Sequence, residues 1–188
     1  MIIQFHKARA GKHLMVLGAL ATTFLGSAAS AASQGNLGAT STGSVVITAS
    51  VANRARITGL ADVTFSAVDP SVNASANQNV CVWSNTATKA YTITATGSGA
   101  GSAFTLVNGT SIVPYTVQWA ASSGQTTGTA LASGTASTSM TSGALNQTCS
   151  VSPTTTASLI VGIASTDLLA MSAGVSHTGT LTLLVTPQ

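Results

Sequence analysis

The side chains best suited to covalent chemistry in this sequence are two cysteines, Cys81 and Cys149. An exported protein with an even cysteine count is expected to form a disulfide. Cys81 and Cys149 are 68 positions apart in the sequence. A disulfide that closes a loop of this length contributes about 4 kcal/mol to stability in the chain-entropy model, less any strain. A redox pair is the alternative, but the sequence has no Cys-x-x-Cys motif and no nearby charge to lower a thiol pKa. The sequence therefore favours a structural disulfide.

Residues suited to acid–base or metal chemistry are sparse. His177 is the one histidine after residue 31, and a packed or solvated histidine is the simpler interpretation. Three aspartates and many serines could complete a Ser-His-Asp arrangement or a glycosidase carboxylate pair, but no Gly-x-Ser-x-Gly motif and no suggestive spacing supports either. With the cysteines bonded, a single histidine leaves no metal cluster. We therefore expect no enzyme activity, no cofactor and no metal. The aspartates are Asp62, Asp69 and Asp167.

Four aromatic residues lie on predicted strands and could form a sugar-stacking platform, although packing in or beside the core is the simpler expectation. They give a second hypothesis: a self-contained secreted β-sandwich that binds a glycan or a surface partner. The four are Trp83, Tyr91, Tyr115 and Trp119.

The stretch Gly43–Ile57, GSVVITASVANRARI, carries apolar residues two apart, which places them on one face of an extended strand. Periodicity alone favours the first strand of an all-β domain; the alternative is a strand offered to another subunit. The same phase extends back to Leu37 and Ala39 through a flexible GATSTG. The apolar set is Val45, Ile47, Ala49 and Val51.

The start of the chain predicts a secretory signal peptide. A basic start is followed by a short apolar core, Leu14 to Leu25, and a small-x-small pattern at Ala29-Ser30-Ala31. We predict a mature chain from Ala32, with cleavage after Ala29 as the alternative, and no stable membrane anchor because the apolar core is too short. We therefore expect export and secretion.

The mature chain has almost no charge. The formal net charge of +3 belongs to the signal peptide, because three basic and three acidic residues remain after it. Nothing in this balance indicates nucleic-acid binding. Near-zero net charge favours association, which suits a subunit of an assembly. The remaining basic residues are Arg54, Arg56 and Lys89.

The body is rich in Val, Thr, Ala, Ser and Gly, which favours strands and turns over helices. Residues 122–147 predict weak strands with long loops, and Ser165 to Met171 predicts a single helical turn. Many short strands with turn signals indicate an immunoglobulin-like β-sandwich. The predicted strands are 61–67, 79–84, 90–96, 103–107, 113–119, 157–164 and 177–186.

Three segments together resemble a chaperone–usher pilin of the archaic type, the spore coat protein U-like family, as a divergent member. They are TGSVVITASVA, NVCVWSNTATKAYTITATGSG and SAGVSHTGTLTLLVTPQ. His177 and Thr178 replace the tyrosine and its neighbour that are usual in the family ending. Cys149, not a cysteine near the amino terminus, is the partner left for Cys81.

The resemblance implies an immunoglobulin-like domain that lacks its last strand. A periplasmic chaperone fills the open groove first, and the amino-terminal strand of the next subunit replaces it at the outer-membrane usher. The chain would then be a structural subunit of a surface pilus or fimbria supporting adhesion or biofilm, with head-to-tail neighbours as partners. The implied division is a signal peptide (1–31), an extension with the donor strand (32–57) and a sandwich domain (58–188).

The resemblance also implies two sets of site residues. The donor residues are Val45, Ile47, Ala49 and Val51. The residues bordering the receiving groove are Leu181, Leu183 and Val185.

Overall fold

The computed structural model describes residues 31–188, so the predicted signal peptide lies outside the described residues except for its last. The described chain divides into two units between Ser50 and Val51. Within residues 31–188, no helix has the length and apolar character needed to cross a membrane.

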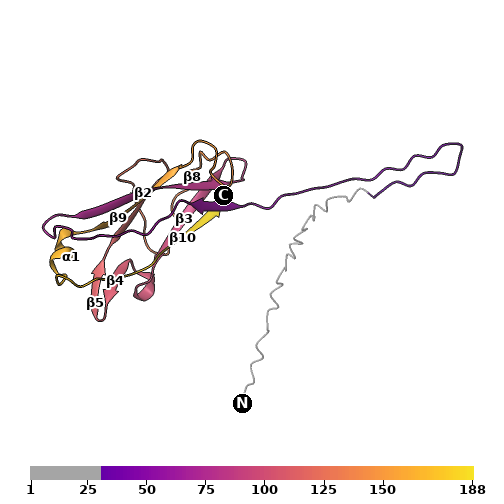
Figure 1. Cartoon of the computed structure of the whole chain (residues 1–188). Helices are drawn as coiled ribbons and strands as arrows, with labels where there is room; N and C mark the ends of the chain where they lie inside the picture. The colour runs from indigo at the N-terminus through magenta and orange to yellow at the C-terminus, as the bar shows by residue number, and fades with distance from the viewer. Residues whose placement is uncertain (1–30) are drawn as a thin grey trace, which may run out of the picture. The chain divides into compact units, whose positions relative to one another are not determined.

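The larger sheet has five strands in the order β1-β2-β9-β6-β7, and all neighbours are antiparallel. Figure 1 shows β2 and β9 of this sheet. β9 lies at its centre, and its sequence ASLIVGI is almost entirely buried, as a continuous apolar strand should be. The bounds are β1 Ala55–Thr58, β2 Ala74–Ser84, β6 Thr116–Ala120, β7 Thr129–Ala130 and β9 Ala157–Ile163.

The second sheet has three strands in the order β10-β3-β8, and β4 and β5 form a separate hairpin. A 3-10 turn, η1, follows β3, and a short helix, α1, follows β9 where a single helical turn was predicted. The bounds are β3 Ala90–Gly97, η1 Ala100–Ser102, β4 Thr105–Asn108, β5 Ser111–Pro114, β8 Met140–Thr141, α1 Ser165–Leu169 and β10 Leu181–Pro187.

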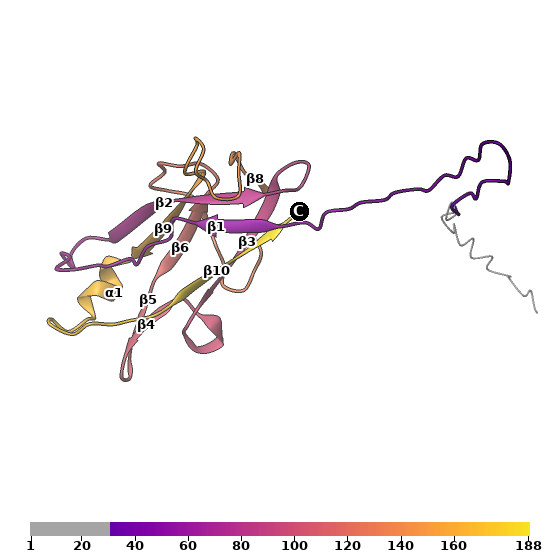
Figure 2. The same cartoon turned by 45° about the vertical axis from the view of Figure 1, so that its right-hand side comes forward.

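The two sheets pack face to face around one core, which confirms the predicted all-β, immunoglobulin-like sandwich. Figure 2 shows β2 and β9 in one layer and β3 and β10 in the other. The core is formed where alternate side chains of β3 meet those of β6 and β9. Its most buried members include Val80, Val82, Tyr91, Ile93, Val117 and Trp119.

The structure divides the predicted strand 113–119 into two strands. β5 ends at Pro114 and pairs with β4, whereas β6 begins at Thr116 and pairs with β9. Proline has no N–H to donate and interrupts a ladder. The backbone N–H of Tyr115, between the two strands, donates to the carbonyl of Phe104 at 2.9 Å. The chain thus changes sheets at Pro114.

The prediction of a strand at residues 61–67 is wrong. β1 follows β2 only to Thr58, and Gly59 then adopts a left-handed φ of 84°. Ala61 is held by the side chain of Gln78 instead: its N–H donates to Gln78 Oε1 at 2.7 Å, and Gln78 Nε2 donates to its carbonyl at 3.1 Å. If the β1–β2 register continued, Ala61 would pair with the backbone of Gln78. The side-chain amide of Gln78 takes the place of that backbone pairing.

The predicted disulfide is present between Cys81 on β2 and Cys149 in the loop after β8. Ala144 and Trp83 pack against it in a small second cluster. Ser142, in the same loop, donates to the carbonyl of Val82. The disulfide and this hydrogen bond attach a long polar loop to the larger sheet.

The described part of the smaller unit, residues 31–50, contains one backbone pairing. Ser33 and Ser44 exchange two backbone hydrogen bonds of 2.9 and 3.0 Å, and their hydroxyls lie 2.7 Å apart. This pairing folds back the segment that carries Leu37, so the apolar phase does not continue as one strand to Val45. The stretch Gly43–Ile57 is likewise not one paired strand, because ladder pairing begins only at Ala55.

Candidate functional site: a groove beside strand β10

The free edge of the smaller sheet is the backbone of β10. Alternate residues of an antiparallel strand direct both backbone groups to the same side. Thr180 accepts from Ser98 N–H at 2.9 Å, and Gln188 N–H donates to Ala90 at 3.0 Å, so even-numbered residues face β3. Odd-numbered residues therefore direct N–H and C=O away from β3, where the described residues pair no strand.

The same odd-numbered residues carry apolar side chains that face the sandwich. Leu181, Leu183 and Val185 are half-buried and pack against the core, whereas Thr182, Leu184 and Thr186 are exposed. A strand added at this edge would find backbone partners and apolar side chains on the same residues. That combination is what β-strand addition uses.

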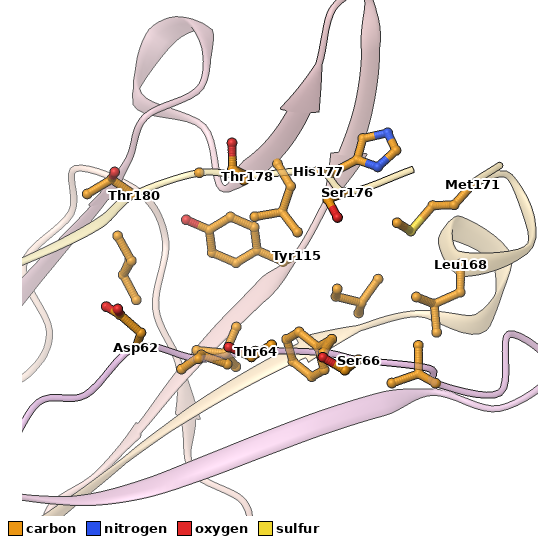
Figure 3. A pocket seen from close by; sticks show the side chains of 18 of the residues that line it. Asp62, Thr64, Ser66, Tyr115, Leu168, Met171, Ser176, His177, Thr178 and Thr180 are labelled. Carbon is orange, nitrogen blue, oxygen red and sulfur yellow. The ribbon is translucent and has the colours of Figure 1, made fainter. Parts of the chain in front are cut away.

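A groove with a cavity volume of about 870 Å³ lies along this edge (Figure 3). Its floor comes from β9 and α1 and is buried and apolar, with Leu159, Val161, Ile163 and Leu168. One wall is the segment 174–181 with Leu183, and the other is the segment 60–68. Its volume falls in the range typical of ligand sites, about 300–1,000 Å³.

The second wall is the segment that leaves the ladder after β1. Phe65 and Val68 are half-buried against the core, while Val63 is exposed. Figure 3 shows Asp62, Thr64 and Ser66 along this side of the groove. Gln78 holds the wall at Ala61 at the distance of a side chain, which keeps it apart from β2.

The groove extends past α1 at one end, which we name the open end, and stops before Val185 at the other, which we name the closed end. The lining continues past α1 to Met171 and Val175, but it stops at Leu183 and does not include Val185. Near the C-terminal end of β10 the edge is covered by β1, which contacts β10 (Figure 2). A chain in the groove could thus leave it past α1.

Two polar groups of the groove lining have no hydrogen-bond partner among the described residues, Tyr115 Oη and His177 Nδ1. Burial raises the pKa of Tyr115, so its hydroxyl stays protonated at neutral pH. His177 Nε2 lies 2.9 Å from Ser111 Oγ and ties the groove wall to β5. Neither Tyr115 Oη nor His177 has a hydrogen bond to a carboxylate among the described residues, so no Ser-His-Asp arrangement is formed around the His177–Ser111 pair.

The predicted groove residues lie on β10, whereas the predicted donor residues lie in the exposed chain before β1. Leu181 and Leu183 line the groove, whereas Val185 lies beyond its closed end. Val45 and Ile47, in the smaller unit, are 70% and 89% exposed, and Ala49 is exposed as well. Val51, at the start of the larger unit, is 81% exposed. Sequence reasoning missed the wall at 60–68, for which Gly59 was the available signal.

The remaining candidates do not form a second site. Tyr91, Tyr115 and Trp119 are buried, and Trp119 Nε1 donates to Tyr91 Oη at 3.4 Å. Trp83 packs against the disulfide cluster, so these rings present no exposed stacking platform. Across residues 31–188 no group of three or more His, Cys, Asp or Glu could hold a metal ion.

These features define an immunoglobulin-like sandwich with an unpaired edge strand and an open apolar groove. No protein-family model matches the chain, and no curated protein matches its sequence. Among solved structures, it is similar to the CsuC–CsuE chaperone–tip adhesion subunit pre-assembly complex from archaic chaperone–usher Csu pili of Acinetobacter baumannii. The match has 18% identity and a TM-score of 0.39, and covers 72% of this chain and 40% of that one. So distant a likeness assigns no function.

Proposed function

We propose that this protein is a structural subunit of a surface fibre, in which the amino-terminal strand of one copy fills the groove of the next. The observation that carries the proposal is the groove itself: an apolar floor beside β10 residues whose outward backbone groups pair with no strand within residues 31–188. An unpaired, partly apolar edge of this kind is a liability in a monomer and a binding site in an assembly.

The occupant is matched by the exposed stretch before β1. Its apolar residues alternate as those of β10 do, and near-zero net charge adds no repulsion between copies. In an antiparallel pair with β10, residue 51 would lie at the open end of the groove, from which the chain can continue to its own domain. A contact of this head-to-tail kind does not close and therefore makes fibres.

Other components follow from the exposure of the groove before assembly. A chaperone would cover it during export, and an outer-membrane usher would exchange the chaperone for the next subunit. The mature chain, from Ala32, would reach the cell surface, where the fibre would support adhesion.

The test compares two aspartate substitutions at neighbouring positions of the full mature chain. Ile47→Asp places a charge on the face that enters the groove, whereas Thr48→Asp places the same charge on the opposite face. Burying Ile47 should contribute roughly 1.5–3 kcal/mol. We expect Ile47→Asp to stop fibre formation and Thr48→Asp to permit it, by negative-stain microscopy and size-exclusion chromatography.

A peptide of residues 43–53 supplies the second arm. It should bind the Ile47→Asp chain, whose own donor is disabled, and keep it soluble. Normal fibres from Ile47→Asp, or no binding of the peptide, would refute the donor assignment. A stable monomer that needs its first strand in cis would instead favour the self-contained binding module.

A further inference from the structure

The charged residues of the larger unit are separated towards its two ends. Arg54, Arg56 and Lys89 lie where β2 ends, and Asp69 and Asp167 lie where β2 begins. β2 has 11 residues, so the two ends are about 33 Å apart. That exceeds the Debye length of about 10 Å at 0.1 M salt, so the ends do not neutralise each other. Asp62 lies between them along the groove wall.

The acidic end is formed by the turn before β2 and by α1, which lie together in Figures 1 and 2. The N–H of Ser165, the first residue of α1, donates to Asn73 Oδ1 at 2.9 Å and joins the two segments. Asp69 accepts from the hydroxyl and the N–H of Ser71 at 2.7 and 2.9 Å, and these bonds lower its pKa. Asp167 lies in the first turn of α1.

Apolar side chains are exposed on the same two segments and on the groove wall. Val72 is 57% exposed and Leu169 is 65% exposed, and Val175 at the mouth of the groove is exposed as well. The acidic end is thus continuous with the open end of the groove. An apolar centre with a charged rim is the usual anatomy of a protein interface.

The basic end contains the root of the amino-terminal extension. Asn85 fixes this root: its Oδ1 accepts from Arg54 N–H at 2.6 Å, and its Nδ2 donates to the carbonyl of Ala52 at 2.9 Å. Arg54 and Arg56 are exposed. Lys89 lies in the β2–β3 turn, which also contains Asn85. Only four residue steps separate Val51 from Ala55, which allows at most about 14 Å.

We infer that the basic end of one copy docks on the acidic end of the next copy as its donor strand enters the groove. The inference rests on the proposed function and adds a second contact to it. With Val51 at the open end of the neighbour's groove, the short root brings Arg54 and Arg56 to the acidic end beside α1. Opposite charges on the two ends favour this head-to-tail encounter and oppose head-to-head and tail-to-tail ones.

The experiment measures fibre growth of the full mature chain carrying paired charge reversals at one end. Arg54→Glu together with Arg56→Glu makes both ends acidic, and Asp69→Lys together with Asp167→Lys makes both ends basic. Each variant alone should grow about fivefold to tenfold more slowly than wild type at low salt, with the difference shrinking at high salt. An equal mixture of the two should recover the wild-type rate, because an alternating fibre restores opposite charges at every junction.

Three controls complete the experiment. Thr182→Glu adds a negative charge on the exposed face of β10, away from both ends, and should leave growth unchanged. Asp69→Asn together with Asp167→Asn removes both charges but keeps an acceptor for Ser71, so a defect shared with the paired lysine substitutions is electrostatic. The peptide 43–53 ends before Arg54, so it should bind Ile47→Asp chains with and without Asp69→Lys equally.

The outcomes separate the two proposals. Paired reversals that grow at the wild-type rate, or a mixture no faster than its components, would overturn the docking of the two ends. Failure of the peptide to bind the Ile47→Asp chain would overturn the donor strand itself. Peptide binding together with slow growth of each reversed variant and a recovered mixture is the expected result.

Discussion

β9 and β10 show how differently two strands of one sandwich are used. β9 is paired on both sides, by β2 and β6, and its side chains are almost all buried. Among the described residues, β10 is paired only by β3, and its inward side chains remain half-exposed over the groove. The comparison indicates that the contribution of β9 to stability is complete within one copy, whereas the contribution of β10 depends on what fills the groove.

The largest expected effect is on stability, from a substitution in the larger sheet beside the fully paired strand β9. Trp119→Ala removes a core side chain from β6, beside β9, and should lower the free energy of unfolding by about 3–5 kcal/mol. The loss should be the same with and without the peptide 43–53, because Trp119 is not part of the groove lining. Urea unfolding of the assembly-blocked Ile47→Asp chain measures it.

A smaller and conditional effect is expected in β10. Leu183→Ala should lower the stability of the empty chain by only about 1 kcal/mol, since the side chain is half-exposed, below the usual cost of about 2–5 for a buried leucine. With the peptide bound the cost should increase, and peptide affinity should fall about tenfold. Fluorescence anisotropy of a labelled peptide gives the affinity.

Leu184→Ala is the matched control, because Leu184 is 59% exposed on the outer face of the same strand. It should change stability by no more than about 0.5 kcal/mol with or without peptide. Equal effects of the two substitutions would contradict the assignment of the inner face of β10 to the groove.

The smallest effect is expected from alkaline pH. Burial raises the pKa of Tyr91, and the hydrogen bond from Trp119 opposes this only in part; burial also raises the pKa of Tyr115. For both tyrosines the folded-state pKa lies above the unfolded value of 10.0. Their contribution to the free energy of unfolding is therefore fully present below pH 10 and is lost as the pH rises through the folded-state pKa. Tyrosinate absorbance and urea unfolding across this range measure it. Filling the groove should delay ionisation of Tyr115 but not of Tyr91.

Much of the fold could be predicted from local pattern. The buried run of β9, the alternation in β3 and β10, the single turn of α1 and the disulfide each have a sequence signal that acts within a few residues or through cysteine count. The interruption at Pro114 has a signal too, in the missing N–H, but this signal does not distinguish a strand edge from a change of sheet.

The groove was harder to predict from the sequence than the strands, because it exists only where the segment 60–68 does not pair with a strand. The alternation of Val63 and Phe65 predicts a strand, and only the positive φ of Gly59 and the bidentate contact of Gln78 remove that segment from the ladder. Likewise, Ile47 has no pairing partner within residues 31–50, the described part of its own unit, and no periodicity can reveal this. The separation of charges towards opposite ends of β2 depends on the sheet register.

The position of the open end determines how a fibre would bear mechanical load. In the proposed fibre, tension would reach the donor strand through Val51 at the α1 end and would reach the accepting domain through its own root at Asn85, at the opposite end of β2. The force would then run parallel to β10, in shear, so hydrogen bonds along the strand would have to break together rather than one after another. Forced separation is governed by a rate of rupture, and this loading direction makes that rate slow without any covalent link between copies.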